Sequence, residues 1–258
     1  MRKNVFYKKA CRNELLRYRQ MKTTLLMAKV PSAHDQTAEV RRRKTAEVRR
    51  RLLQTGMREA GIPIDPADRI IRSPDGKPRL SGYPDFHFSL SHSGDYIACI
   101  FSGDEIGLDL QEHRQPAGIS GSCLRIARRF FTAQEYAALQ ALQAQQTPES
   151  GSGGNRSLQK DPVTRLFYHL WTITEAYLKY LGCGRRGNMA GFYPLPLPDP
   201  QFPVQGFRGK IEVFEDKACN TDNVLFHPAA YALLPAPEGY SMAVCAKKLP
   251  AGICIRSV

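Results

Sequence analysis

Two acidic residues, an amide and a lysine stand at spacings that suit metal-assisted chemistry on a phosphate group. Side chains alternate along the expected strand Ile106–Gln111, so Asp109 and Gln111 share one face. In a second segment, expected to be a helix, Glu175 and Lys179 are four residues apart and lie on one face. Magnesium is usually held by one or two carboxylates with phosphates and water. Asp109 and Glu175 would therefore suffice as protein ligands, and Lys179 would neutralise a bound phosphate.

Each of these residues also has an ordinary structural explanation. A single Asp in an apolar strand is often a hydrogen-bonded turn residue, and a Glu/Lys pair at this spacing is usually a solvated helix face. A histidine such as His92 often caps a turn. The joint occurrence of these groups favours the functional interpretation.

Five segments, taken in order, resemble the Sfp-type 4′-phosphopantetheinyl transferases, which move phosphopantetheine from coenzyme A to a carrier-protein serine. They are Gly76–Leu80, Phe88–Tyr96, Gly107–Gln111, Arg128–Tyr136 and Trp171–Gly184. The ordered set is far more specific than any one segment. The resemblance implies an α+β fold with two similar halves. Each half would pack a long helix on a small antiparallel sheet, with the ligand cleft between the halves.

The resemblance also implies roles for individual residues. Asp109 and Glu175 would bind the magnesium ion that bridges the pyrophosphate of coenzyme A, with Gln111 as a weak ligand or one acting through water. Manganese suits the same oxygen ligands. Glu175 would also take the proton of the acceptor serine as its oxygen attacks the β-phosphorus, so that 3′,5′-adenosine bisphosphate leaves. Lys179 matches the lysine that contacts the pyrophosphate.

Three further residues match the positions that meet the nucleotide in this family. Ser91 and His92 match those that hold the 3′-phosphate of coenzyme A, and Lys77 matches a basic residue near the nucleotide.

Two residues depart from the family pattern. Gln111 stands where the family often has a second carboxylate, so water would complete the coordination of the metal. Thr174 stands where a lysine commonly precedes the helical Glu, which removes a positive charge from the phosphate end of the site. Glu112 does not replace the missing ligand, because in a regular strand its side chain points away from Asp109.

The 258 residues suit one large domain or two smaller ones. By the resemblance, residues 21–103 form the N-terminal half and residues 104–258 form the C-terminal half, which carries the metal site. Residues 1–20 are expected to be a poorly ordered extension, with Met21 as an alternative start. A Gly/Ser/Gln/Pro-rich stretch at 144–162 is expected to be a flexible loop. Strands are expected at Val213–Asp216, Tyr231–Pro235 and Tyr240–Lys248.

Seven cysteines occur without a C-x-x-C motif or a Cys/His cluster, which argues against a zinc site and against a secreted disulfide framework. Cys99 and Cys245 lie in apolar runs and are expected in the core. No run approaches the roughly 20 apolar residues of a membrane span. We therefore expect a cytoplasmic protein that does not enter a membrane.

Positive charge is concentrated near the N-terminus. Residues 1–60 contain 17 Lys/Arg and 5 Asp/Glu, a net of +12 out of the total of +13, which leaves +1 for the other 198 residues. A tandem octapeptide, Thr37–Lys44 and Thr45–Leu52, predicts a helix from about Ala38 to Ala60. This helix is either a solvated face or a surface for an acidic carrier protein.

Two alternatives accompany the transferase hypothesis. The arginine-rich segment 38–60 would suit a nucleic-acid-binding protein, although it lacks aromatic residues between its charges. Gln111 and Thr174 would suit a family member that has lost activity. Under the transferase hypothesis the partners are coenzyme A and an acidic acyl or peptidyl carrier protein, without nucleic acid, and the resemblance implies a monomer.

Overall fold

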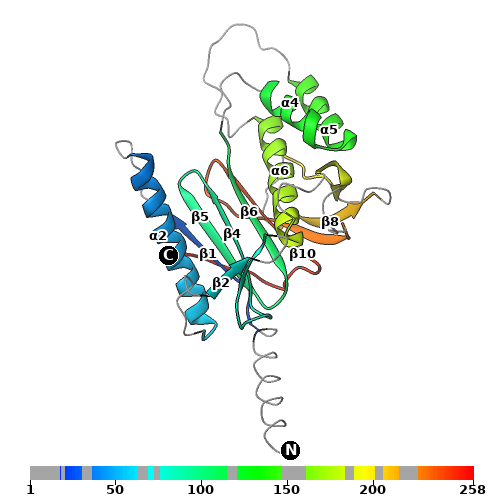
Figure 1. The fold of residues 1–258 in the computed structure, drawn as a ribbon. Coiled ribbons are helices and arrows are strands. Elements are labelled where there is room, and N and C mark those ends of the chain that lie inside the picture. The colour runs from blue at the N-terminus through cyan, green and yellow to red at the C-terminus, as the bar shows by residue number, and fades with distance from the viewer. Residues whose placement is uncertain are drawn as a thin grey trace, which may run out of the picture. The chain divides into compact units, whose positions relative to one another are not determined.

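The computed structural model describes residues 18, 21–30, 37–62, 69–72, 76–114, 121–146, 161–183, 189–200, 206–214 and 226–258. The fold is α+β, as predicted (Figure 1). The chain divides into two compact units, one formed by Met1–Gly107 with Pro250–Val258 and the other by Leu108–Leu249. The first boundary lies close to the expected division at 103/104. The C-terminal segment differs from the expectation, because it belongs to unit 1.

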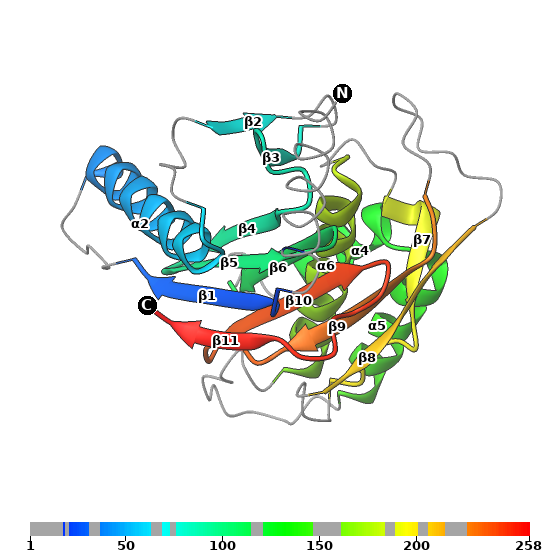
Figure 2. The same cartoon turned by 90° about the horizontal axis from the view of Figure 1, so that it is seen from below.

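In its described segments, unit 1 contains one long helix and two sheets. The larger sheet has the strand order β11-β1-β5-β4, and β2 pairs with β3 in a separate hairpin. Strand β5 pairs antiparallel with β1 and β4, whereas β11 runs parallel to β1, as the neighbouring strands in Figure 2 show. We had expected a wholly antiparallel sheet, and the parallel pairing of β11 with β1 differs from that expectation. The elements are β1 (Thr24–Lys29), α2 (Ala38–Glu59), β2 (Ile70–Arg72), β3 (Pro78–Leu80), β4 (His87–Ser93), β5 (Tyr96–Ser102) and β11 (Cys254–Ser257).

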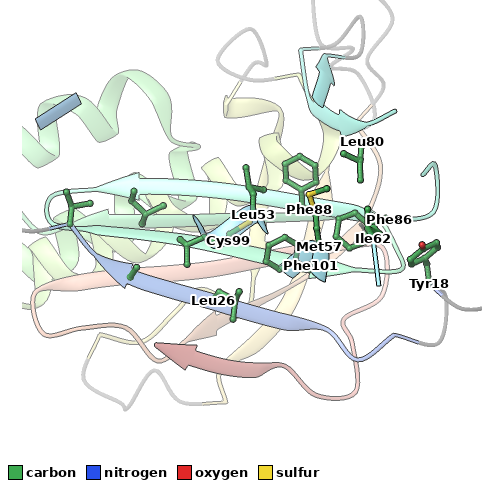
Figure 3. Packing of buried hydrophobic residues seen from close by; sticks show 14 residues of the cluster. Tyr18, Leu26, Leu53, Met57, Ile62, Leu80, Phe86, Phe88, Cys99 and Phe101 are labelled. Atoms are coloured by element: carbon green, nitrogen blue, oxygen red, sulfur yellow. The ribbon is translucent and has the colours of Figure 1, made fainter. Parts of the chain in front are cut away.

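Helix α2 is the helix predicted from the tandem octapeptide. Thr37 caps its N-terminus by accepting a hydrogen bond from the Val40 amide, and Glu39 in the first turn complements the helix dipole. Its C-terminal half packs on β1 and β5. Gly56 allows the close approach, since a Cβ there would lie 2.2 Å from the ring of Phe101. Figure 3 shows the core that results, with side chains from α2 gathered against those of β1, β4 and β5.

Unit 2 contains a five-stranded sheet with the order β6-β10-β9-β8-β7 and three helices among the described residues. Helix α6 packs on β10 and β9, and helices α4 and α5 pack together and against α6. The elements are β6 (Ile106–Glu112), which begins at the boundary of the units, α4 (Gly121–Phe130), α5 (Ala133–Gln145), α6 (Pro162–Leu181), η3 (Met189–Gly191), β7 (Phe192–Leu195), β8 (Arg208–Val213), β9 (Ala229–Leu234) and β10 (Tyr240–Ala246).

Both ends of α6 carry clear sequence signals. The Asp161 carboxylate accepts hydrogen bonds from the amides of Val163 and Thr164, and Pro162 occupies the first turn. Gly182 ends the helix with a φ of 87°, a left-handed conformation that favours glycine. Most of the helix is buried, so it is the central support of unit 2.

Two of the three predicted C-terminal strands are confirmed as β9 and β10. Of the third predicted strand, Val213–Asp216, Val213 is the last residue of β8 and Phe214 follows the strand, whereas residues 215 and 216 lie outside the described residues. The alternation of its residues is short, and pairing with β9 and β7 sets the strand instead. Cys99 and Cys245 are fully buried, as expected.

Two expected irregular segments lie largely outside the described residues. The predicted loop at 144–162 lies outside the described residues except at its ends, where α5 finishes and α6 begins. The extension 1–20 is described only at Tyr18. The Tyr18 ring is buried and lies 6.1 Å from that of Tyr83 and 6.0 Å from that of Phe86, so this residue belongs to the core of unit 1. Within the described part of the chain, no helix has the length and apolar character needed to span a bilayer.

Candidate active site

Asp109 is a buried carboxylate on β6 whose polar partners include Lys179 and Gln111. Its exposure is only 1%. Oδ1 accepts a hydrogen bond from Nζ of Lys179 at 2.6 Å, and Oδ2 accepts one from Nε2 of Gln111 at 2.9 Å. Asp109 and Gln111 thus lie side by side, as the alternation of a strand requires. A charge so deeply buried needs such partners.

The second half of the site comes from α6. Glu175 is half-buried and lies one turn before Lys179, whose side chain is 29% exposed. The position of Lys179 in the last turn of α6 also complements the helix dipole. The packing of α6 on the sheet therefore brings an ammonium group from one element onto a carboxylate from another.

The donor set fits a hard cation. No group of three or more His, Cys, Asp or Glu side chains that could hold a metal occurs in the described ranges. Magnesium does not require such a group, because one or two carboxylates with water and phosphate oxygens are its usual ligands. The ammonium of Lys179 already occupies a cationic position beside Asp109. Asp109, Gln111 and Glu175 are thus the residues that would hold the ion.

Glu112 and Thr174 flank this site in the sequence. Glu112 pairs with Arg114 at the surface. Thr174, at the position where the resemblance led us to expect a lysine, is buried at 2% exposure. The structure thus has a buried hydroxyl at this position.

Lys77, in unit 1, lies in a cluster of basic groups around one carboxylate. Its buried Nζ donates to Oε2 of Glu105 at 2.5 Å and to the carbonyl of Ile106 at 3.2 Å. Arg79 also pairs with Glu105, and His87 Nδ1 lies 3.2 Å from it. Burial raises the pKa of Glu105, but hydrogen bonds from His87 and Lys77 and the charge of Lys77 outweigh it and hold the pKa well below 4.5. Lys77 is thus an internally paired lysine.

Ser91 and His92 are neighbours on β4. Ser91 is buried at 5% exposure and His92 is exposed. Successive side chains of a strand point to opposite faces, so the two side chains do not share a face of β4. Their common role in holding a 3′-phosphate stays a prediction.

A largely buried polar cluster in unit 2, in which only His113 is half-buried, was missed by the sequence reasoning. It consists of His113, Tyr168, His169 and Ser241. Burial and the charges of His113 and Arg165 lower the pKa of His169 to about 3. The alternation that pairs Asp109 with Gln111 also includes position 113, so His113 could have been found. Nothing in the sequence marks Ser241, because its contact depends on the fold.

Comparison with known proteins identifies the family. The family model described as the 4′-phosphopantetheinyl transferase superfamily matches residues 105–245 of the chain. The chain belongs to this superfamily. The match includes Asp109, Gln111, Glu175 and Lys179, and the nucleotide-site candidates of unit 1 lie before it.

Individual phosphopantetheinyl transferases are similar over a longer stretch. The 4′-phosphopantetheinyl transferase Sfp of Bacillus subtilis strain 168 is 31% identical over 185 residues, which cover 71% of this chain and 65% of that protein. Another 4′-phosphopantetheinyl transferase of Bacillus subtilis is 32% identical, with 66% and 59% covered. One from Bacillus pumilus is 29% identical, with 71% and 63% covered. The chain thus spans less than two thirds of the length of these curated relatives. The comparisons support the Sfp type and do not favour a nucleic-acid-binding protein.

Proposed function

We propose that this phosphopantetheinyl transferase superfamily member transfers the 4′-phosphopantetheine group of coenzyme A to a serine hydroxyl of an acyl or peptidyl carrier protein. The observation that carries the proposal is the buried Asp109 carboxylate with Lys179 against it, inside the part of the chain that matches the family. The acceptor oxygen forms a bond to the β-phosphorus, the phosphorus–oxygen bond to 3′,5′-adenosine bisphosphate breaks, and the serine proton passes to a base.

The residues of unit 2 have distinct roles in this reaction. Lys179 donates to the pyrophosphate, whose negative charge replaces that of Asp109 as its partner. Glu175 accepts the serine proton, directly or through water. Asp109, Gln111 and Glu175 would hold a magnesium or manganese ion, which would supply neutralisation of charge on the phosphate oxygens.

Three residues of unit 1 are part of the proposal as ligands of coenzyme A. Ser91 and His92 contribute to binding of the 3′-phosphate, and Lys77 lies near the nucleotide. For Lys77 the structure favours a modest direct role, because Glu105 already neutralises its charge. Arg79, which is more exposed than Lys77, also pairs with Glu105.

The partner is an acidic carrier protein, the protein acts as a monomer, and the compartment is the cytoplasm. The proposal of an acidic partner is supported by basic side chains on α2, because Arg42, Arg43 and Arg49 are exposed and could contact acidic groups. Free thiols at all five cysteines of the described segments suit a reducing compartment.

The test is the intact mass of apo carrier proteins incubated with the protein, coenzyme A and magnesium chloride. Transfer adds about 340 Da to the serine of the carrier. Asp109→Asn should abolish the gain. Glu112→Gln, a neighbouring change on the other face of β6, should preserve it. Failure of the wild-type protein to modify any carrier would contradict the proposal. If coenzyme A still bound, that result would indicate an inactive family member.

A further inference from the structure

The chain just after β6 is fixed to α6 by a tyrosine. The amide of Arg114 donates to the hydroxyl of Tyr168 at 3.0 Å, and this hydroxyl donates to the carbonyl of Arg114 at 2.8 Å. The ring of His113 stacks on that of Tyr168, with centroids 4.7 Å apart and an interplanar angle of 17°. Both the hydrogen bonds and the ring stacking therefore hold the segment just after β6 to α6.

A buried serine ties the same point to a third element. Oγ of Ser241, on β10, lies 2.7 Å from Nε2 of His113 and 2.9 Å from Nδ1 of His169. A hydroxyl carries one hydrogen and two lone pairs, so it donates to at most one of the two ring nitrogens and accepts from the N–H of the other. At least one of the two rings therefore carries its hydrogen on the nitrogen that faces Ser241. The amide of His113 also donates to the carbonyl of Gly239 at 2.7 Å, just before β10.

Stability alone does not explain this cluster. Nδ1 of His113 and Nε2 of His169 are buried atoms without a hydrogen-bond partner among the described residues. An unpaired buried polar group costs about 1–3 kcal/mol. An apolar cluster of the same shape would avoid that cost, which points to a role for this cluster besides stability.

The elements joined by this cluster are those that carry the candidate active site. Strand β6 carries Asp109 and Gln111, and α6 carries Glu175 and Lys179. The contact of 2.6 Å between Asp109 and Lys179 requires a fixed position of β6 along α6.

We propose that His113, Tyr168, His169 and Ser241 form a clamp that holds β6 in register with α6 and so positions Asp109 and Gln111 against Glu175 and Lys179. These four are positioning residues, since they act through the site residues. The effect of these residues on metal affinity rests on the function proposed above. Their effect on the Asp109–Lys179 pair does not depend on that function.

Helix α6 supplies a matched control for the test. Tyr177 makes the same pair of hydrogen bonds as Tyr168, because its hydroxyl donates to the carbonyl of His227 at 2.7 Å and accepts from its amide at 3.1 Å. His227 is not part of β6. Tyr168→Phe and Tyr177→Phe therefore remove equivalent groups from one helix, and only the first releases β6.

The primary measurement is the affinity for Mn2+ in the presence of coenzyme A, followed by electron paramagnetic resonance of the free ion. Tyr168→Phe should weaken binding about tenfold, as loss of a residue supporting metal ligands typically does. Tyr177→Phe should bind as the wild type does. Ser241→Ala should resemble Tyr168→Phe. Equal affinities for Tyr168→Phe and Tyr177→Phe would overturn the clamp, even if both variants were less stable.

A second measurement does not depend on the metal or on activity. The 13C signal of the Asp109 carboxyl group reports its pairing with Lys179 in metal-free protein. The chemical shift of this signal should change in Tyr168→Phe and remain unchanged in Tyr177→Phe. If the wild type neither bound Mn2+ nor modified a carrier, the proposed function would fail, and this signal would decide on the clamp. An unmoved signal in both variants would then refute it.

Discussion

In the central pair of the site, the positive charge of Lys179 neutralises the negative charge of Asp109. Removing the ammonium with Lys179→Met leaves the Asp109 carboxylate 1% exposed and without that cation. Breaking a buried pair from one side typically costs 3–5 kcal/mol, and the partial exposure of Lys179 favours the low end, about 3 kcal/mol of unfolding free energy. Urea denaturation measures this loss. The double variant Asp109→Asn/Lys179→Met should recover part of it. A double variant as unstable as the sum of the single ones would show that the two residues do not interact.

Gln111 is a hydrogen-bond donor to Asp109. In Gln111→Glu the donor at 2.9 Å is replaced by a second negative charge beside a buried one. We expect the metal-free protein to lose about 1–3 kcal/mol. Added magnesium should stabilise this variant more than the wild type, because a third carboxylate strengthens binding. Thermal unfolding with and without magnesium chloride tests both effects. An unchanged midpoint in metal-free buffer would contradict the assigned hydrogen bond.

Residue-level prediction from the sequence succeeded where local periodicity decides the outcome. The shared face of Asp109 and Gln111 follows from strand alternation, and the placing of Glu175 and Lys179 follows from helical spacing. The contact between Asp109 and Lys179 could not be predicted this way, because 70 residues separate them in the sequence. The pairing of Lys77 with Glu105 was not predicted, for the same reason. Both depend on packing between elements.

At the scale of elements, the N-terminus of α5 contains a buried titratable group. Glu135 is 1% exposed and forms a capping box, in which its carboxylate accepts from the amide and hydroxyl of Thr132. Burial raises its pKa from 4.5 to about 7, although the Thr132 hydrogen bonds oppose the change. The folded state therefore binds this proton more tightly than the unfolded state. Its contribution to stability is fully present below about pH 4.5 and is lost as the pH rises through about 7.

Glu135→Gln should remove this pH dependence. The amide oxygen of Gln still accepts from Thr132, so the cap survives without the ionisable group. A rise in pKa from 4.5 to about 7 corresponds to roughly 3 kcal/mol. The variant should thus be more stable than the wild type by about that amount at pH 8 and similar to it at pH 4.5. Urea midpoints across this range give the answer, with the exposed Glu39→Gln as control. Parallel pH profiles for Glu135→Gln and the wild type would rule out the raised pKa.

Elements with strong local signals were predicted well. The Glu/Arg spacing of the tandem octapeptide predicted α2 almost to its ends. The helix expected around Glu175 and Lys179 is confirmed as part of α6. A strand was expected to begin at Val213, where β8 ends, because a short alternation does not specify where pairing starts or stops. Strand β11 was not predicted, since its position depends on pairing with β1 at the other end of the chain.

For the whole molecule, β11 links the C-terminus to unit 1. The Cys254 amide donates to the carbonyl of Thr23 at 3.0 Å, and the Val258 amide donates to that of Met27 at 2.9 Å. Arg51 of α2 donates to the carbonyl of Val258 at 3.2 Å, and Arg256 pairs with Glu59. Unit 1 is thus built from both ends of the chain, whereas unit 2 is one continuous segment.

Removal of residues 250–258 should therefore weaken unit 1 selectively. The deletion turns β1 into an edge strand and removes the bonds to α2, while unit 2 keeps all its residues. Local opening follows the stability of each cooperative segment. In hydrogen-exchange mass spectrometry, amides of β1 should exchange about tenfold faster or more, because each lost backbone hydrogen bond contributes about 1 kcal/mol. Amides of β10 should keep the wild-type rate. If β10 accelerated as much as β1, the two units would open as one cooperative structure, and the division seen in the fold would not extend to stability.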